Sequence, residues 1–405
     1  MKKINKILPD NPVYVILLIL MMLVGIGFFA MMTIVNAFPI NMIIGFIVVM
    51  LGMIALVDFL FMRDTKWKRI VGIVLSAIFI LVYGLGIYYL TTTQSMFSRI
   101  SVSDASAAAK AKGVNVTEDS YNIYITGIDQ WDSEKGYDLE RSDVNMIVTV
   151  CPKTHKILLT SIPRDSYVPL HSNGAMDKLT HTGVYGVDET LSTVESWLGI
   201  EINYYVKANF NAVVDVINAI DGVDVYSDRE FSPVKRSWWT VKKGWNHMNG
   251  KEALAFARER KAYNEEDSQR VLNQQKVMKA MLDKMTTSTT LLTKYDEIVS
   301  AAGNSMETNM PTSDMQSLVK MQLTDLGKWN IKTQRVSGKY DMDYVASLTQ
   351  ESKFQVYKVK KSEVERITKN INKTMHPSSA EIAAATASRQ KNSILSFIKN
   401  LKGNK

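Results

Sequence analysis

The stretch "YNIYITGI" (residues 121–128) decides the fold, because its apolar residues recur at the short period of a β-strand. Three further short apolar runs follow it: "VNMIVTVC" (144–151), "KILLTSI" (156–162) and "NYYVKAN" (203–209). Four helices are predicted between and after these strands, at Asp188–Leu198, Asn211–Ile220, Gly250–Ala257 and Asp267–Met285. This mixture predicts one α/β domain with a central mixed sheet flanked by helices.

Three apolar segments precede this domain, and each is long enough to cross a bilayer. They are Val13–Val35, Met42–Met62 and Ile70–Leu90, and only Asp58 interrupts them. A cleaved secretory signal would show one short apolar region before a small-residue cleavage site. The segments therefore predict three permanent transmembrane helices.

The Lys and Arg residues of the short flanking segments predict the orientation of these helices. Three Lys residues precede the first span, four Lys and Arg residues lie in the second loop (63–69), and the 36–41 turn has none. The N-terminus is therefore expected in the cytoplasm. An odd number of spans then places everything after Leu90 outside the cytoplasmic membrane.

The formal net charge of +8 does not indicate a polyanion partner. Residues 1–91 contain seven Lys and Arg against three Asp, so half of the excess lies in the membrane region. The remainder is too mildly basic for nucleic-acid binding. The single cysteine, Cys151, excludes an intrachain disulfide and is expected to be a buried, inert thiol.

Four regions are predicted along the chain. Residues 1–91 form the membrane domain, 92–120 a Ser-, Thr- and Ala-rich linker, and 121–374 the α/β domain. Residues 375–405 form a basic tail with no acidic residue after Glu381. This tail is expected to be solvated and partly disordered, with a membrane- or wall-binding segment as the alternative.

Two carboxylates occupy the ends of the first two strands. Asp129 closes one strand and Asp143 opens the next, so the two side chains would meet if the strands are neighbours. Mg²⁺ commonly binds one or two carboxylates and fills its other positions with water and phosphate oxygens. The alternative is a turn role, since Asp is frequent where strands end.

The stretch "ARERKAYNEEDSQRVLNQQ" (257–275) concentrates cations and amides. Arg258 and Arg260 end one predicted helix, while Arg270 and Gln274 lie four apart on one face of the next. Converging Arg donors suit the oxygens of a diphosphate. A solvated charged face explains the spacing equally well, with Glu259, Glu265, Glu266 and Asp267 as partners.

Two other features extend this pattern. "SIPRD" places Arg164 and Asp165 after a strand, and "DKLTHTGVYG" adds Lys178; a surface salt bridge would explain the Arg–Asp pair as well. The second helix also has an apolar side, which either packs in the core or borders a lipid tail. That side comprises Val271, Met278, Met281, Leu282 and Met285.

Five segments, in this order, resemble the LytR–CpsA–Psr family over residues 121–369. They are "YNIYITGID…RSDVNMIVTV", "SIPRDSYVPL", "DKLTHTGVYGVDETL", "FNAVVDVINAIDGVDVY" and "HMNGKEALAFARERKAYNEEDSQRVLNQQKV". The resemblance implies a phosphotransferase that joins a glycan from an undecaprenyl-pyrophosphate carrier to peptidoglycan through a phosphodiester. It also implies an α/β domain that encloses the polyprenyl tail. The three spans resemble the streptococcal-type capsule or exopolysaccharide members more than the single-span wall teichoic acid enzymes.

The resemblance also implies roles for individual residues. Asp129 and Asp143 would hold Mg²⁺, with Mn²⁺ as a substitute, and Asp267 would be the base for the acceptor hydroxyl. Arg164, Arg258 and Arg260 would act in both binding and catalysis. The full set on the pyrophosphate would be Arg164, Lys178, Arg258, Arg260, Arg270 and Gln274. Such a protein would lie in the cell membrane of a Gram-positive type bacterium, alongside other polysaccharide-assembly proteins.

Two other functions fit the same residues. A non-catalytic membrane regulator could bind the lipid-linked glycan and control its polymerisation or export. A pyrophosphatase could use water in place of the acceptor at the same site. A transcriptional regulator is excluded by the predicted topology, which separates the domain from DNA.

Overall fold

The computed structural model describes residues 11–63, 65–101, 113–128, 142–234, 239–262, 266–286, 288–303, 306–325, 327–348 and 351–389 of the 405-residue chain. These residues form two compact units. Unit 1 comprises Met1–Ser98 and Met315–Thr324, and unit 2 comprises Arg99–Asp314 and Asp325–Lys405.

Unit 1 contains three apolar helices that are long enough to cross a membrane: α1 (Pro12–Val35), α2 (Ile40–Phe61) and α3 (Lys66–Ile100). Asn11 starts α1 by accepting a 2.9 Å hydrogen bond from the Val13 amide. The ring of Phe61 occupies the place where a Cβ on Gly72 would lie, so α2 and α3 approach closely there. The three predicted spans are confirmed as helices of this length and composition.

The third helix continues beyond the predicted span. Residues 92–100, which begin the expected linker, are helical. The hydroxyls of Thr91 and Thr92 donate to the Tyr88 carbonyl within the helix, so these polar residues do not interrupt it. Most of the remaining linker, residues 102–112, lies outside the described residues.

Unit 2 is built on a six-stranded mixed sheet in the order β10-β3-β2-β1-β6-β9. The central strands β1, β2 and β3 are antiparallel neighbours, β6 is parallel to β1, β10 is parallel to β3, and β9 is antiparallel to β6. The bounds are β1 Tyr121–Ile128, β2 Ser142–Cys151, β3 Lys156–Ile162, β6 Tyr204–Asn209, β9 Met306–Thr308 and β10 Asn330–Arg335. The four predicted strands and the mixed α/β class are confirmed.

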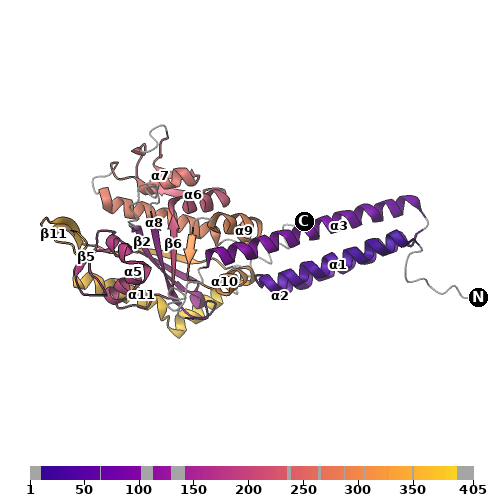
Figure 1. The fold of residues 1–405 in the computed structure, drawn as a ribbon, viewed down its shortest axis with the longest axis horizontal. Helices are drawn as coiled ribbons and strands as arrows, with labels where there is room; N and C mark the ends of the chain where they lie inside the picture. Colours follow the sequence, from indigo (N-terminus) through magenta and orange to yellow (C-terminus); the bar gives the residue numbers. More distant parts are fainter. Residues whose placement is uncertain are drawn as a thin grey trace, which may run out of the picture. The chain divides into compact units, whose positions relative to one another are not determined.

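Helices cover both faces of this sheet (Figure 1). Tyr124, Ile147 and Tyr205 point to one face and pack in a core with α5 (Val187–Leu198) and α11 (Lys361–Met375). The opposite face is covered by α6 (Phe210–Ala219), α7 (Gly250–Arg258), α8 (Glu266–Met285) and α9 (Ser288–Gly303). Alternate residues of each strand therefore serve two different layers.

Several smaller elements were not anticipated from the sequence. Three two-stranded sheets pair β4 (Tyr167–Pro169) with β5 (Met176–Lys178), β7 (Val223–Ser227) with β8 (Gly244–Met248), and β11 (Lys339–Asp343) with β12 (Phe354–Lys358). Two 3₁₀ helices, η2 (Pro152–Thr154) and η3 (Leu179–Tyr185), and helix α10 (Thr312–Asp325) were not anticipated either. The β7–β8 hairpin packs on α7 and α8 through a second core that includes Val225 and Phe256.

The first part of the expected flexible tail is helical and packed. Residues 379–389 form a helix. Glu381 pairs with Lys156 at 2.9 Å, and Arg389 pairs with Asp325 at 2.8 Å. Residues 390–405 lie outside the described residues, so the prediction for the basic end of the tail stays a prediction.

Candidate functional site

A cavity of about 270 Å³ lies between the sheet and helices α6 to α9. Most of the strand residues that line it point away from the α5 and α11 side, namely Ile125, Gly127, Val144, Met146, Val206 and Ala208. The helices contribute mainly aliphatic and methionine side chains. The alternation of each strand thus produces one packed core and one apolar cavity on opposite faces of the same sheet.

Helix α8 supplies the flexible wall of this cavity. Met278, Met281, Leu282 and Met285 line it, whereas Val271 is buried elsewhere. The sequence left a packed core and a lipid contact as alternatives for this side of the helix. Four of its five residues face an internal space that could hold an apolar chain, and unbranched Met side chains can adapt to such a ligand.

Four polar residues interrupt the apolar lining, and Thr126 and Asn209 are two of them. Arg258 at the end of α7 and Gln274 on α8 both border the cavity. The guanidinium carbon of Arg258 lies 4.3 Å from the centroid of the Phe210 ring, which also lines the cavity. This cation–π contact holds the positive charge beside the apolar space.

The loop after α7 is organised by Glu259, which the sequence analysis did not identify as a functional residue. Its side chain is 4% exposed. The carboxylate accepts from the backbone amides of Arg260 and Ala262, both at 3.1 Å, and of Val234 at 2.9 Å. The solvated-face alternative is therefore wrong for Glu259, because this carboxylate is buried against backbone amides. Nothing in the spacing of the motif distinguished it from a surface Glu.

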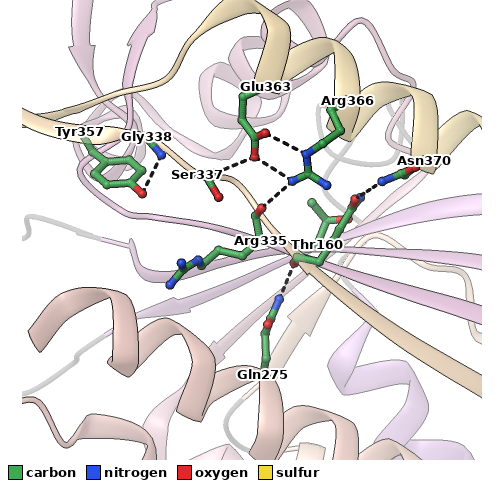
Figure 2. A network of polar contacts seen from close by, with 10 residues as sticks. Thr160, Gln275, Arg335, Ser337, Gly338, Tyr357, Glu363, Arg366 and Asn370 are labelled. Carbon is green, nitrogen blue, oxygen red and sulfur yellow. Dashed lines mark hydrogen bonds and ion pairs between the residues drawn. The ribbon is translucent and has the colours of Figure 1, made fainter. Parts of the chain in front are cut away.

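A hydrogen bond of the Gln275 side chain connects helix α8 to the sheet (Figure 2). The Gln275 side chain donates to the Gln334 carbonyl on β10, and Gln334 in turn donates to Thr160 on β3 at 2.9 Å. Asn370 of α11 donates to the Gln334 side chain at 2.9 Å. These bonds fix the position of α8, the helix that also carries Gln274 and the buried Arg270.

Helices α7 and α8 are also joined directly. The Asn273 side chain is fully buried and donates to the carbonyl of Phe256 at 3.1 Å. That carbonyl belongs to the last turn of α7, where backbone carbonyls lack the amide partner four residues on that they have inside a helix. Arg258 and Gln274 therefore lie on two helices whose relative position is set by a buried hydrogen bond.

A chain of charged residues lies at the ends of β2 and β3. Arg164 pairs with Asp143 at 2.5 Å and with Asp165 at 3.6 Å, and Asp165 also pairs with Lys178 at 3.3 Å. The structure thus brings together three residues of the predicted site, Asp143, Arg164 and Lys178, that lie 14 to 35 residues apart in the sequence. A simple surface Arg164–Asp165 pair does not describe this arrangement, because Asp143 is the shorter contact.

The structure describes only part of the predicted metal pair. Ile128 pairs with Ser142, so the residues that precede Asp129 and Asp143 are cross-strand partners. Asp129 itself lies outside the described residues, as does the side chain of Asp267, whose backbone is in the first turn of α8. Among the described residues, no three or more His, Cys, Asp or Glu side chains gather as a metal site.

Lys178 is held by the buried Asp177–His181 pair. Nδ1 of His181 lies 2.8 Å from Asp177 and 2.8 Å from the Ser347 hydroxyl. Burial raises the pKa of Asp177, but hydrogen bonds from His181, Ser347 and the Lys178 amide outweigh it, so the pKa is lowered overall. The ionised Asp177 locks the backbone next to Lys178.

The fold and the site together define a membrane-anchored α/β protein whose cavity is apolar inside and cationic at one edge. The LytR_cpsA_psr family model matches residues 87–373, and the chain belongs to this family. The chain is 32% identical over 259 residues to the polyisoprenyl-teichoic acid–peptidoglycan teichoic acid transferase TagU of Bacillus anthracis, covering 62% of this chain and 83% of the relative. It is 33% identical over 259 residues to the corresponding transferase TagT of Bacillus subtilis, covering 62% of this chain and 79% of TagT.

Solved structures show the same fold. B. subtilis TagV aligns with a TM-score of 0.52 at 29% identity, over 64% of this chain and 98% of TagV. The TagT protein with bound octaprenyl pyrophosphate lipid aligns with a TM-score of 0.50 at 25% identity, over 68% of this chain and 99% of that structure.

Proposed function

We propose that this protein transfers a capsular polysaccharide or exopolysaccharide from an undecaprenyl-pyrophosphate carrier to peptidoglycan, forming a phosphodiester. The observation that carries the proposal is the apolar cavity with Arg258 and Gln274 on its wall. A polyprenyl diphosphate has the same division into an apolar chain and an anionic head. The TagT structure with a polyprenyl pyrophosphate supports this ligand class.

In the proposed reaction, the sugar keeps its bond to the phosphate next to it, and this determines which bond of the diphosphate breaks. The acceptor hydroxyl oxygen attacks the phosphorus that carries the sugar, and the bond from that phosphorus to the bridging oxygen breaks. Polyprenyl monophosphate leaves, and the sugar stays joined to the acceptor through one phosphate. We assign to Asp267, at the start of α8, the role of the base that takes the proton from the acceptor hydroxyl.

The protein's contribution is mainly position and charge. Arg258, Arg260 and Arg270 would bind the diphosphate from the α7 and α8 side, and Gln274 would add an amide. Arg164 and Lys178 would bind it from the ends of β3 and β5. The carboxylates of Asp143 and Asp165 hold these two cations in place before substrate arrives.

The residues at the end of β2 suit a magnesium ion. A carboxylate has four acceptor positions, so Asp143 can bind a hard cation while it accepts from Arg164. Asp143 and Asp129 would hold Mg²⁺, or Mn²⁺ in its place. When bound, the ion would neutralise charge on the diphosphate oxygens.

The membrane topology completes the proposal. We assign the N-terminus and the 63–69 loop to the cytoplasm and unit 2 to the outer side, where peptidoglycan lies. A cysteine introduced at Ser103 should react with an impermeant thiol reagent on intact protoplasts, and one at Thr65 should not. Labelling at Thr65 alone would reverse the orientation and remove access to the wall.

The decisive experiment reconstitutes the full chain with lipid-linked glycan and purified peptidoglycan. A covalent glycan–peptidoglycan conjugate that retains one phosphate is expected. Arg258→Ala should lower the rate about tenfold or more, because one charge-assisted hydrogen bond contributes about 1.5–3 kcal/mol. Release of free glycan phosphate without a conjugate would instead support the pyrophosphatase, and binding without turnover would support the regulator.

A further inference from the structure

The β11–β12 hairpin carries a row of large side chains that are exposed to solvent. Tyr340, Met342 and Tyr344 are 39%, 52% and 42% exposed, and they follow one another at every second position. Because side chains alternate along a strand, Tyr340 and Met342 share one face of β11, and Tyr344 follows directly after the strand ends at Asp343. Tyr340 is oriented by a contact of 5.0 Å between ring centroids with Tyr357, and Lys353 lies 5.4 Å from the Tyr344 ring centroid.

The opposite side of the same strand is charged. Lys358 pairs with Asp341 and with Asp343, each at 2.8 Å. Charged side chains along a strand oppose the addition of a further strand from another protein.

The hairpin is joined directly to the site. The Tyr357 amide donates to the Asp165 carbonyl at 2.7 Å, and Asp165 is the residue that pairs with Lys178 and Arg164. The Tyr167 hydroxyl donates to the Tyr344 carbonyl at 2.7 Å. In the sheet register, Tyr167 is the partner of Lys178, so Tyr167 connects the Tyr344 end of the row to the strand that carries one of the predicted phosphate-binding cations.

The hairpin is also held rigidly where it leaves the row. The Ser347 amide donates to the buried Asp177 at 2.8 Å, and the Ser347 hydroxyl bonds to His181. Tyr344, three residues before Ser347, is the last residue of the row. An exposed row on a fixed support can bind a partner with little ordering cost.

We propose that Tyr340, Met342 and Tyr344 form a platform for the glycan strand of the peptidoglycan acceptor. Pyranose rings have apolar C–H faces with hydroxyl rims, which match tyrosine rings that are apolar in the middle and polar at the tip. Lys353 complements the carboxylates that wall peptides carry. The donor is already held by its lipid and diphosphate, whereas the acceptor has no other anchor in the proposed reaction.

This inference rests on the proposed function for its choice of acceptor, but its test does not require turnover. The full chain in detergent is sedimented with purified peptidoglycan that has been stripped of attached polymers. The test variant carries Tyr340→Ser, Met342→Ser and Tyr344→Ser together. The control carries Tyr226→Ser and Trp245→Ser, an exposed pair on β7–β8 whose side chains are 42% and 74% exposed.

The triple variant should lose about tenfold or more of its affinity for peptidoglycan, while octaprenyl diphosphate binding and the thermal midpoint stay at wild-type values. In the transfer assay, only the KM for peptidoglycan should rise. Equal sedimentation of wild type and triple variant overturns the platform, as does an equal loss in the control. A change confined to oligomeric state or to liposome binding overturns it as well. If the wild type transfers no glycan but the triple variant alone loses sedimentation, the proposed function fails and the platform stands.

Discussion

Replacing Glu259 tests whether the loop after α7 is organised by its carboxylate. The change to Ala removes the acceptor for three backbone amides, those of Val234, Arg260 and Ala262. Arg260 lies inside this turn, and Arg258 directly precedes it. Both arginines should therefore lose their fixed positions when the turn loosens.

The expected loss of stability follows from those bonds. Each amide left without an acceptor costs about 1–3 kcal/mol, and partial access of water to this loop favours the low end. Three amides then predict a loss of about 3 kcal/mol in the free energy of unfolding for Glu259→Ala. Glu259→Gln keeps one acceptor oxygen, although its NH₂ group faces a backbone donor. Its loss of unfolding free energy should therefore be smaller than that of Glu259→Ala.

Hydrogen exchange and ligand binding measure the two effects separately. The amides of Val234, Arg260 and Ala262 should exchange faster in Glu259→Ala than in wild type. Affinity for octaprenyl diphosphate should fall about tenfold or more, since charge-assisted hydrogen bonds are disturbed. The order wild type, Gln, Ala is expected in both measurements.

Glu252→Ala is the matched control on the same helix. Glu252 accepts from the Asn249 amide in the capping box that starts α7, whereas Arg258 ends the helix. Its loss should cost about 1 kcal/mol without changing ligand affinity. Wild-type exchange rates and affinity in Glu259→Ala would refute the role of the buried carboxylate. An equal loss of affinity in Glu252→Ala would show that the loss comes from lower overall stability and not from the turn that Glu259 holds.

Three further changes test other parts of unit 2. Met281→Trp should fill part of the cavity and weaken binding of octaprenyl diphosphate more than of geranyl diphosphate; equal effects on both would place the chain elsewhere. Burial lowers the pKa of His155 although Asp325 opposes this, so the unfolded state binds more protons below about pH 6.5 and stability should fall as the pH drops from 7.5 to 5.5. His155→Asn, which tolerates the left-handed backbone there, should reduce that slope in thermal unfolding, and an unchanged slope would contradict the role of His155. Asp143→Asn should weaken Mn²⁺ binding, followed by electron paramagnetic resonance, and unchanged binding would leave Asp143 only its contact with Arg164.

The sequence predicted the parts of the fold that have strong apolar periodicity. The strands at 121–128 and 156–162 have the predicted bounds, because they are buried on both faces of a central sheet. The strand β11 could not be found in this way, since its sequence KYDMD is exposed on nearly every residue. Helix α11 was missed because Ile367 and Ile371 are its only fully buried residues. Short or solvated elements are set by tertiary contacts that leave little trace in local composition.

The candidate site was predictable as a set of residue types but not as an arrangement. The pairing of Ile128 with Ser142 follows from two adjacent strands, and the sequence anticipated that neighbourhood. The ion pair between Arg164 and Asp143 joins two strand ends, and nothing local distinguishes it from the Arg164–Asp165 pair. The cavity was equally hidden, because the apolar side of α8 has the same spacing whether it meets a core or an internal space.

The burial of Glu259 explains how one loop can hold a carboxylate between two arginines and still suit a diphosphate. An exposed Glu there would neutralise the arginines in the free protein and repel the phosphates of the ligand. The observed carboxylate instead faces inward, and the backbone amides of Val234, Arg260 and Ala262 surround it. Its charge is used to fix the turn, which leaves the two flanking guanidinium groups to be placed by their own contacts. For Arg258 that contact is the Phe210 ring on the cavity wall, where the polar head of an amphiphile would meet its chain.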